Sequence, residues 1–171
     1  DTDEKLFESR AGIYAEFGKV VVIGVGKFDY DENNILQFRN RIFSGYDEHI
    51  LLQSFQKFLM SEEISDLQLC AHNGKEFDFP FLCRRFLINS LPIPKILGLQ
   101  GKKPWDVKQL DTLDMWKFGD YKNYTSLNLL AHVFEIPSPK ENMDGSQVSK
   151  VYYEEKNLKK IEEYCMNDVI T

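Results

Sequence analysis

The feature that most constrains the fold is a mostly β-branched run near the start of the chain. Residues 19–28 read Lys-Val-Val-Val-Ile-Gly-Val-Gly-Lys-Phe, a pattern typical of a strand buried on both faces. Turn-forming residues follow over 29–34, and the partly alternating segment 35–43 predicts a second strand that pairs with the first as a hairpin. The chain must therefore build much of its core against a sheet.

Helix and strand patterns alternate through the rest of the 171 residues. The predicted elements are, in order, a helix over 47–60, a strand over 67–71, a helix over 80–89, a strand over 107–113, and helices over 126–134 and 152–170. This alternation predicts the α/β class, with the hairpin adding an antiparallel part to an otherwise parallel sheet. The length suits one domain, and no linker interrupts it, so we expect a single domain over 1–171.

Composition excludes some classes of function. No apolar run approaches the ~20 residues of a membrane-spanning helix, so no membrane partner is expected. A net charge of −6 disfavours a broad DNA-binding face but permits a small acidic site that recruits cations. Cys70, Cys83 and Cys165 have no C-x-x-C spacing, so we expect buried free thiols in a reducing compartment, the cytoplasm.

Asp78 and Asn73 lie where the strand over 67–71 gives way to a helix. Strand-to-helix junctions are where α/β folds place ligand groups, and a helix N-terminus keeps a carboxylate ionised. Asp78 could instead cap the helix that Pro80 opens. Asn73 precedes a glycine, so it either forms a turn or offers its amide to a nucleotide or a metal-bound water.

Tyr164 and Asp168 are four residues apart in the last predicted helix, which places them on one face. A core tyrosine beside a surface aspartate is the alternative interpretation. With Asp78 and Asn73 they form a set of oxygen and amide groups that favours hard-cation binding and metal-assisted phosphate chemistry.

The other polar residues carry weaker indications. None of the three histidines has a metal-ligand spacing, so we expect no catalytic histidine. Asp111 and Asp114 flank a strand end and could approach the site, but a capping or solvated role is the simpler expectation. Lysines cluster in and after the loop over 91–105, where they solubilise the loop or contact nucleic acid: Lys95, Lys102, Lys103 and Lys108.

Three segments together resemble a known enzyme superfamily. His72-Asn-Gly-Lys-Glu-Phe-Asp78 resembles the second motif, N-x-x-x-F-D, of the DEDD 3′–5′ exonucleases, and Tyr164-x-x-x-Asp168 resembles the third motif of their tyrosine-bearing branch. Asp111-Thr-Leu-Asp, followed by Ser126-Leu-Asn-Leu-Leu-Ala, is similar to the segment between those motifs. The chain most resembles the stand-alone exonucleases related to the proofreading domain of family B DNA polymerases. The resemblance implies a ribonuclease H-like fold, with a mixed central sheet flanked by helices.

One motif of that superfamily is missing from the sequence. Its first motif, D-x-E, would supply two of four metal ligands from the central strand of the implied sheet. Asp1-Thr-Asp-Glu4 and Asp29-Tyr-Asp-Glu32 have the wrong spacing and lie in polar segments. Loss of a central strand would leave unpaired backbone on two neighbours. We therefore expect the natural protein to begin some tens of residues upstream and to carry D-x-E there.

The resemblance implies hydrolysis of phosphodiester bonds with two divalent cations, Mg²⁺ or Mn²⁺, ~4 Å apart. Asp78 and Asp168 would be metal ligands, and Tyr164 would orient the attacking water, since an ordinary phenol with a pKa of about 10 is a poor base. Asn73 would hold the 3′-terminal nucleotide. Phe77 joins this substrate-binding set, although its ring is expected to pack beneath the motif rather than stack on a base. The expected substrate is single-stranded DNA, released as nucleoside 5′-monophosphates.

Two other functions fit the same residues. A non-catalytic relative could keep the fold and bind nucleic acid, as half of the ligand set would allow. A metal-dependent phosphohydrolase acting on small nucleotides is the other alternative.

Overall fold

The computed structural model describes residues 11–61, 64, 67–103, 106–120, 122, 124–137, 143 and 145–171. Backbone contacts divide the chain into two units. Unit 1 comprises Asp1–Val20 and Glu48–Ser126, and unit 2 comprises Val21–Asp47 and Leu127–Thr171. The single domain over 1–171 stays a prediction.

Unit 2 contains the hairpin expected from the sequence. Strands β1 (Val22–Tyr30) and β2 (Leu36–Ser44) pair antiparallel, from Val22 opposite Ser44 to Tyr30 opposite Leu36. The turn is held by Asp31, whose Oδ1 accepts hydrogen bonds of 2.9 Å from the N–H groups of Asn33 and Ile35. The predicted turn chemistry is therefore confirmed, and Asp31 serves the turn.

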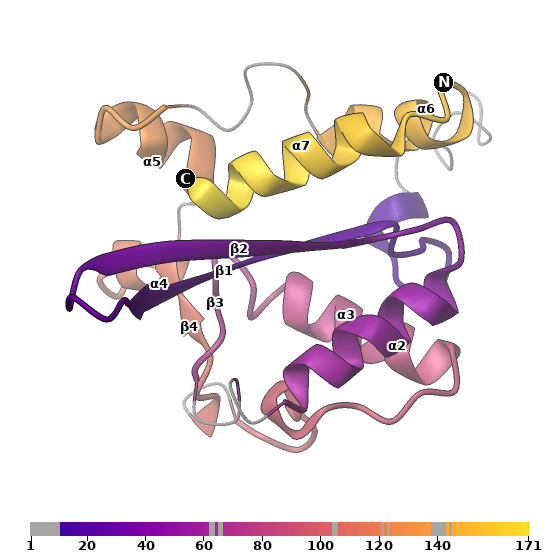
Figure 1. Ribbon diagram of the computed structural model, residues 1–171, viewed down its shortest axis with the longest axis horizontal. Helices are drawn as coiled ribbons and strands as arrows, with labels where there is room; N and C mark the ends of the chain where they lie inside the picture. The colour runs from indigo at the N-terminus through magenta and orange to yellow at the C-terminus, as the bar shows by residue number, and fades with distance from the viewer. Residues whose placement is uncertain are drawn as a thin grey trace. The chain divides into compact units, whose positions relative to one another are not determined.

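Strand β1 is only partly buried, so the prediction of burial on both faces was wrong. Helix α7 (Leu158–Ile170) lies along the hairpin and contacts β1 (Figure 1). Gly24 and Gly26 face this helix without side chains, and the outer end of the strand exposes large rings such as that of Phe28. A glycine-containing strand lets a helix approach closely but contributes little buried surface of its own.

The remaining helices of unit 2 precede α7. They are α5 (Leu127–Val133), the 3₁₀ turn η4 (Gly145–Gln147) and α6 (Val148–Tyr153). The predicted helix over 152–170 is thus two helices, and α7 begins anew where the side chain of Asn157 accepts a hydrogen bond from the Lys160 N–H. The unit packs around Met143, Val151, Tyr152 and Ile161.

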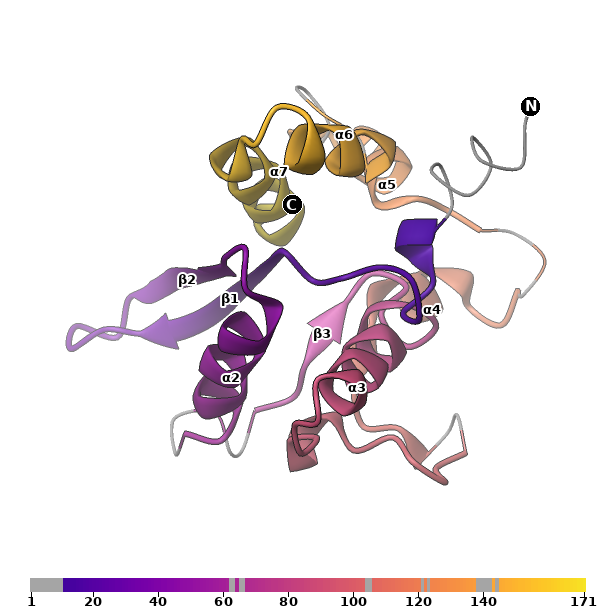
Figure 2. The ribbon, with the colours of Figure 1, turned by 90° about the vertical axis from the view of Figure 1, so that its right-hand side faces the viewer.

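Unit 1 combines helices with a small parallel sheet. The helical elements described in it are η1 (Ala11–Ile13), α2 (Glu48–Leu59), α3 (Asp78–Ile88), η2 (Lys95–Leu97) and α4 (Thr112–Lys117). Strands β3 (Cys70–Ala71) and β4 (Leu110–Asp111) pair in parallel, with Ala71 opposite Asp111. Figure 2 shows α3 beside β3. Both strands are shorter than predicted, and β4 ends at Asp111 because α4 begins at the next residue.

The core of unit 1 contains an ion pair. Arg85 of α3 and Glu48 of α2 are both about nine-tenths buried and form a salt bridge. Glu48 Oε1 also accepts the Val20 N–H at 2.6 Å, and the Arg85 guanidinium donates to the carbonyl of Ala15 at 2.7 Å. The pair therefore ties the segment before β1 to both helices.

The described strands form two two-stranded sheets, β1–β2 and β3–β4, and the single mixed sheet of a ribonuclease H-like fold, with its central strand expected upstream, stays a prediction. Sheets extend only through backbone hydrogen bonds between neighbours, and no described strand pairs with both the hairpin and the β3–β4 pair. The structure thus shows a mixed α/β chain with small sheets and helices.

The structure also bears on two expectations that came from composition, the absence of a membrane-spanning helix and the burial of the cysteines. Within the described ranges, no helix is both long and apolar enough to cross a membrane. The three cysteines are free, but Cys70 is exposed and the other two are only partly buried, so the expectation of buried thiols was wrong for Cys70. It lies on a strand of two residues, which is too short to be covered.

Candidate functional site

A tight turn joins β3 to α3 and carries the first group of predicted site residues. Asn73 adopts a left-handed conformation, with φ of 61°. Its carbonyl accepts the Phe77 N–H at 3.1 Å, and the carbonyl of Gly74 accepts the Phe79 N–H at 2.9 Å. A Cβ on Gly74 would lie 2.6 Å from that of Ala71, so only glycine fits there. Asn73 therefore forms the turn, while contact of its amide with a nucleotide stays a prediction.

Asp78 begins helix α3, but it is not the capping residue. Phe77 occupies the cap position and makes no side-chain cap hydrogen bond. Asp78 lies in the first turn with its side chain exposed, where the helix dipole favours a carboxylate. Pro80 fits two residues further on because that backbone position needs no N–H donor. The alternative in which Asp78 caps the helix is therefore wrong.

Phe77 lies between the turn and the helix. Its side chain is 41% exposed, and its ring centroid is 5.6 Å from that of Phe81, one helical turn further along. The ring packs against the start of α3, as the sequence predicts, and keeps an open face. A role in substrate binding stays a prediction.

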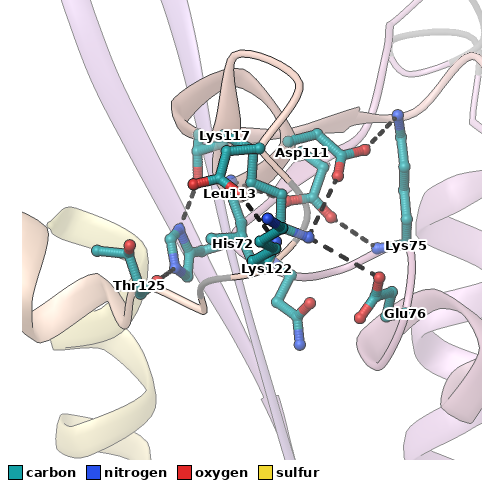
Figure 3. A network of polar contacts seen from close by, with 12 residues as sticks. His72, Lys75, Glu76, Asp111, Leu113, Lys117, Lys122 and Thr125 are labelled. Carbon is teal, nitrogen blue, oxygen red and sulfur yellow. Dashed lines mark hydrogen bonds and ion pairs between the residues drawn. The ribbon is translucent and has the colours of Figure 1, made fainter.

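Asp111 is the charged group that holds this turn, and it was not among the predicted site residues. Its side chain, at the end of β4, is only 3% exposed. Oδ1 accepts the N–H groups of Asn73 and Leu113, each at 2.9 Å, and Oδ2 accepts the Lys75 N–H at 3.0 Å (Figure 3). The expected capping role is confirmed at α4, whereas a solvated role was wrong. The resemblance of residues 111–114 to the segment between the exonuclease motifs was the sequence signal that could have pointed to Asp111.

His72 joins the turn to two later segments. Its Nε2 lies 2.8 Å from the carbonyl oxygen of Thr125, and its Nδ1 lies 3.0 Å from the hydroxyl of Thr112 (Figure 3). A carbonyl only accepts, so Nε2 carries a proton and donates it. Both ring nitrogens are thereby engaged in holding the turn, and the absence of a catalytic histidine stays a prediction.

The cationic side chains around the turn are already paired. Lys75 Nζ is 3.1 Å from Asp114 Oδ2, and Lys117 Nζ is 3.9 Å from carboxylate oxygens of both Asp114 and Glu76 (Figure 3). This edge of unit 1 is therefore not a free basic patch. The four lysines of the loop over 91–105 and just beyond are exposed, and their contact with nucleic acid stays a prediction.

Tyr164 and Asp168 belong to unit 2, where helix α7 carries both at the predicted spacing. Cys165 and Val169 face β1 at Gly24. Tyr164 and Asp168 each precede one of these residues, so they lie on the neighbouring face of the helix. Tyr164 is partly buried and packs against the core of unit 2. The alternative of a core tyrosine is thus correct for its ring, and its hydroxyl lies beside the backbone of Gly145.

The structure brings the predicted residues together in two groups. Asn73, Phe77 and Asp78 are contiguous in unit 1, and Tyr164 and Asp168 share one helix in unit 2. Among the described residues, no three side chains of His, Cys, Asp or Glu gather as a metal site. Carboxylate oxygens are nonetheless the donors that Mg²⁺ and Mn²⁺ prefer, and Mg²⁺ is commonly held by one or two carboxylates plus substrate phosphates. The donor chemistry of Asp78 and Asp168 fits such ions.

The acidic segment over 29–32, which has the wrong spacing for D-x-E, serves the hairpin turn. Asp29 and Asp31 lie at the end of the hairpin, and hydrogen bonds from the N–H groups of Tyr30 and Ile35, respectively, lower the pKa of each. Asp1-Thr-Asp-Glu4 lies outside the described residues.

A family model describing predicted 3′–5′ exonucleases related to the exonuclease domain of PolB matches residues 13–171. The chain therefore belongs to this family. The match spans both units and both groups of site residues. No solved structure matches the chain.

Proposed function

We propose that this chain is a 3′–5′ exonuclease of the tyrosine-bearing DEDD branch, built on one ribonuclease H-like domain and similar to the stand-alone members of that branch. It would act in the cytoplasm on the 3′ ends of single-stranded DNA. Family membership over residues 13–171 supports exonuclease chemistry. The single observation that carries the proposal within the site is the exposed carboxylate of Asp78 in the first turn of α3.

Asp78 and Asp168 are the residues that would hold divalent cations, Mg²⁺ or Mn²⁺. Such cations, when bound, lower the pKa of a water nucleophile and stabilise charge that develops on a leaving oxygen. The protein's own part is to present ionised carboxylates from ordered helices. The first turn of α3 does this for Asp78, because the helix dipole favours its charged form.

The other groups would orient the reactants. The Tyr164 hydroxyl would hydrogen-bond the attacking water and fix its direction, and packing of the ring against the core of unit 2 restricts its motion. Asn73 would hold the 3′-terminal nucleotide from a turn that is itself tied down by four hydrogen bonds. The open face of Phe77 would contact the same nucleotide.

A non-catalytic nucleic-acid-binding relative is the second candidate, and one observation favours it. The sequence has no D-x-E, so it supplies two of the four carboxylates that the superfamily uses. The same experiment distinguishes the two candidates, because binding without Mg²⁺-dependent cleavage would support the second.

The test measures release of labelled mononucleotides from single-stranded DNA that carries its label in the 3′-terminal nucleotide, with and without Mg²⁺. We expect Asp78→Asn and Asp168→Asn each to lower the Mg²⁺-dependent rate by at least about 100-fold, as loss of a metal ligand does. Matched controls are Glu163→Gln, exposed on α7, and Asp106→Asn, exposed in unit 1. Wild-type rates in either ligand variant would remove that residue from the mechanism. Hydrolysis of mononucleotides but not of oligonucleotides would indicate a small-nucleotide phosphohydrolase.

A further inference from the structure

The most unusual charged group in the described structure is the carboxylate of Asp111. It is buried, and its hydrogen-bond partners are three backbone N–H groups from two segments about 36 residues apart. A buried charge is tolerated only when it is well hydrogen-bonded, and N–H donors to a carboxylate make strong bonds. One of the three bonds, to Leu113, caps α4. Capping alone needs only one oxygen and does not explain the other two bonds.

Those two bonds act on the turn that leads into α3. Asp111 fixes the N–H groups of Asn73 and Lys75, and the carbonyls of Asn73 and Gly74 then accept the N–H groups of Phe77 and Phe79. The chain of hydrogen bonds thus runs from Asp111 through the turn to the first residues of the helix. Asp78 lies between Phe77 and Phe79, whose N–H groups make the last two of these hydrogen bonds. Asn73 has φ of 61°, a left-handed conformation that asparagine adopts more readily than most other non-glycine residues, and the Asp111 carboxylate accepts its N–H there.

We propose that Asp111 is a positioning residue: its carboxylate sets the turn over 73–77 and thereby the direction in which Asp78 and Asn73 present their side chains. This inference rests on the proposed function, because it assigns Asp111 to the support of a metal-binding carboxylate. Asp111 is not itself a ligand in this account, since both of its oxygens already accept N–H groups. Second-layer partners of metal ligands commonly change metal affinity by about 10–100-fold when removed.

The variant that tests the inference is Asp111→Asn. Oδ1 accepts two N–H groups and Oδ2 accepts one, so an asparagine can keep its oxygen at the Oδ1 position and place its NH₂ opposite the Lys75 N–H. The NH₂ of the asparagine and the backbone N–H of Lys75 are both donors, so the hydrogen bond at Lys75 would be lost. The matched control is Asp114→Asn, which removes the same charge three residues away. Among the described residues, the Asp114 carboxylate pairs with the side chains of Lys75 and Lys117 and holds no backbone N–H of the turn.

Amide hydrogen exchange is the first measurement. In Asp111→Asn we expect exchange to accelerate by at least about tenfold at Lys75, Phe77 and Phe79, because loss of a charge-assisted hydrogen bond is worth roughly that factor. The control should stay within about twofold of the wild type. Acceleration confined to Leu113 and the rest of α4 would show that Asp111 only caps that helix, and would overturn the inference.

Mg²⁺ affinity is the second measurement, followed by the shift of the Asp78 amide signal as Mg²⁺ is added. We expect Asp111→Asn to weaken Mg²⁺ binding by about tenfold or more, with little change in Asp114→Asn. Unchanged affinity in Asp111→Asn would contradict this inference alone. Absence of Mg²⁺ binding in the wild type would instead contradict the proposed function and, with it, the inference.

A third measurement needs no variant, in case Asp111→Asn does not fold. Scalar couplings across hydrogen bonds, from the amide nitrogens of Asn73 and Lys75 to the carboxyl carbon of Asp111, should be detectable in the wild-type chain. Their absence at both amides would overturn the inference.

Discussion

At the scale of single residues, the site depends on groups that hold backbone rather than on groups that face solvent. Gly74 gives the turn room, and the carboxylate of Asp111 fixes its amides. His72 adds hydrogen bonds to Thr112 and Thr125. None of the three is a ligand in the proposed mechanism, yet each restricts the segment from which Asp78 projects.

The phenol of Tyr164 allows a prediction at this scale. Tyr164→Phe removes one hydroxyl and keeps the ring that packs against the core of unit 2. We expect turnover on single-stranded DNA to fall by about 10–100-fold, because a general positioning contact to the nucleophile is lost. Mg²⁺ affinity, measured by calorimetry, should remain near that of the wild type.

The control for the phenol is Tyr153→Phe, at an exposed tyrosine of α6. It should leave both turnover and stability unchanged. Equal turnover in Tyr164→Phe and the wild type would make that tyrosine purely structural.

At the scale of elements, the glycines of β1 leave space for helix α7 to pack closely against the strand. A Cβ on Gly24 would lie 3.0 Å from a methyl group of Val169 and 3.1 Å from Cys165 Sγ. A side chain at this position would therefore crowd the helix that carries Tyr164 and Asp168. The break between α6 and α7, with the Asn157 cap, gives α7 its own start and hence its own direction.

Gly24→Val tests this close approach. Valine suits a strand, but its branched side chain would press against α7, and overpacking of this kind costs about 1–3 kcal/mol. We expect the free energy of unfolding, measured with urea, to fall by that amount. Gly45→Ala is the control in the same unit, because a Cβ there meets nothing closer than 3.8 Å. A Gly24→Val chain as stable as the wild type would show that α7 is free to shift.

At the scale of the whole molecule, stability should depend on pH through the buried pair of unit 1. Burial raises the pKa of Glu48, but hydrogen bonds from Arg85, the Val20 N–H and Asn89 outweigh it, and the pKa lies below the ordinary value of 4.5. A carboxyl group whose pKa is lower in the folded than in the unfolded chain stabilises the fold fully above pH 4.5. This contribution is lost as the pH falls through the folded-state pKa.

Glu48→Ala should therefore be strongly destabilising at neutral pH, by about 3–5 kcal/mol, because it leaves Arg85 charged and buried without its partner. As the pH falls below 4.5, the free energy of unfolding should decrease less in Glu48→Ala than in the wild type. Urea unfolding at pH 7 and at acidic pH measures both effects.

The control is Glu155→Ala, which removes an exposed ion pair with Lys160 and should change stability by less than about 1 kcal/mol. An equally small effect in Glu48→Ala would contradict the role given to the buried pair.

Local patterns predicted the order and type of most elements. The hairpin, α2, α3 and α5 were predicted near their observed bounds, because periodicity and turn residues act within a few positions. Strand lengths and the division of the last helix were not predicted, since a two-residue parallel strand and a helix break depend on partners elsewhere. The motif residues around Asp78 and Asp168 were found from the sequence, and the supporting role of Asp111 was not.

What the sequence determined by itself is the motif chemistry and its local setting: a carboxylate at the start of one helix, and a phenol and a second carboxylate one turn apart on another. Only the tertiary structure decided which groups hold them. Asp111 accepts the Lys75 N–H across 36 positions, and Arg85 reaches Glu48 across 37. Such pairs form when distant segments bury polar groups together and each must find a partner, a requirement that no short stretch of sequence records.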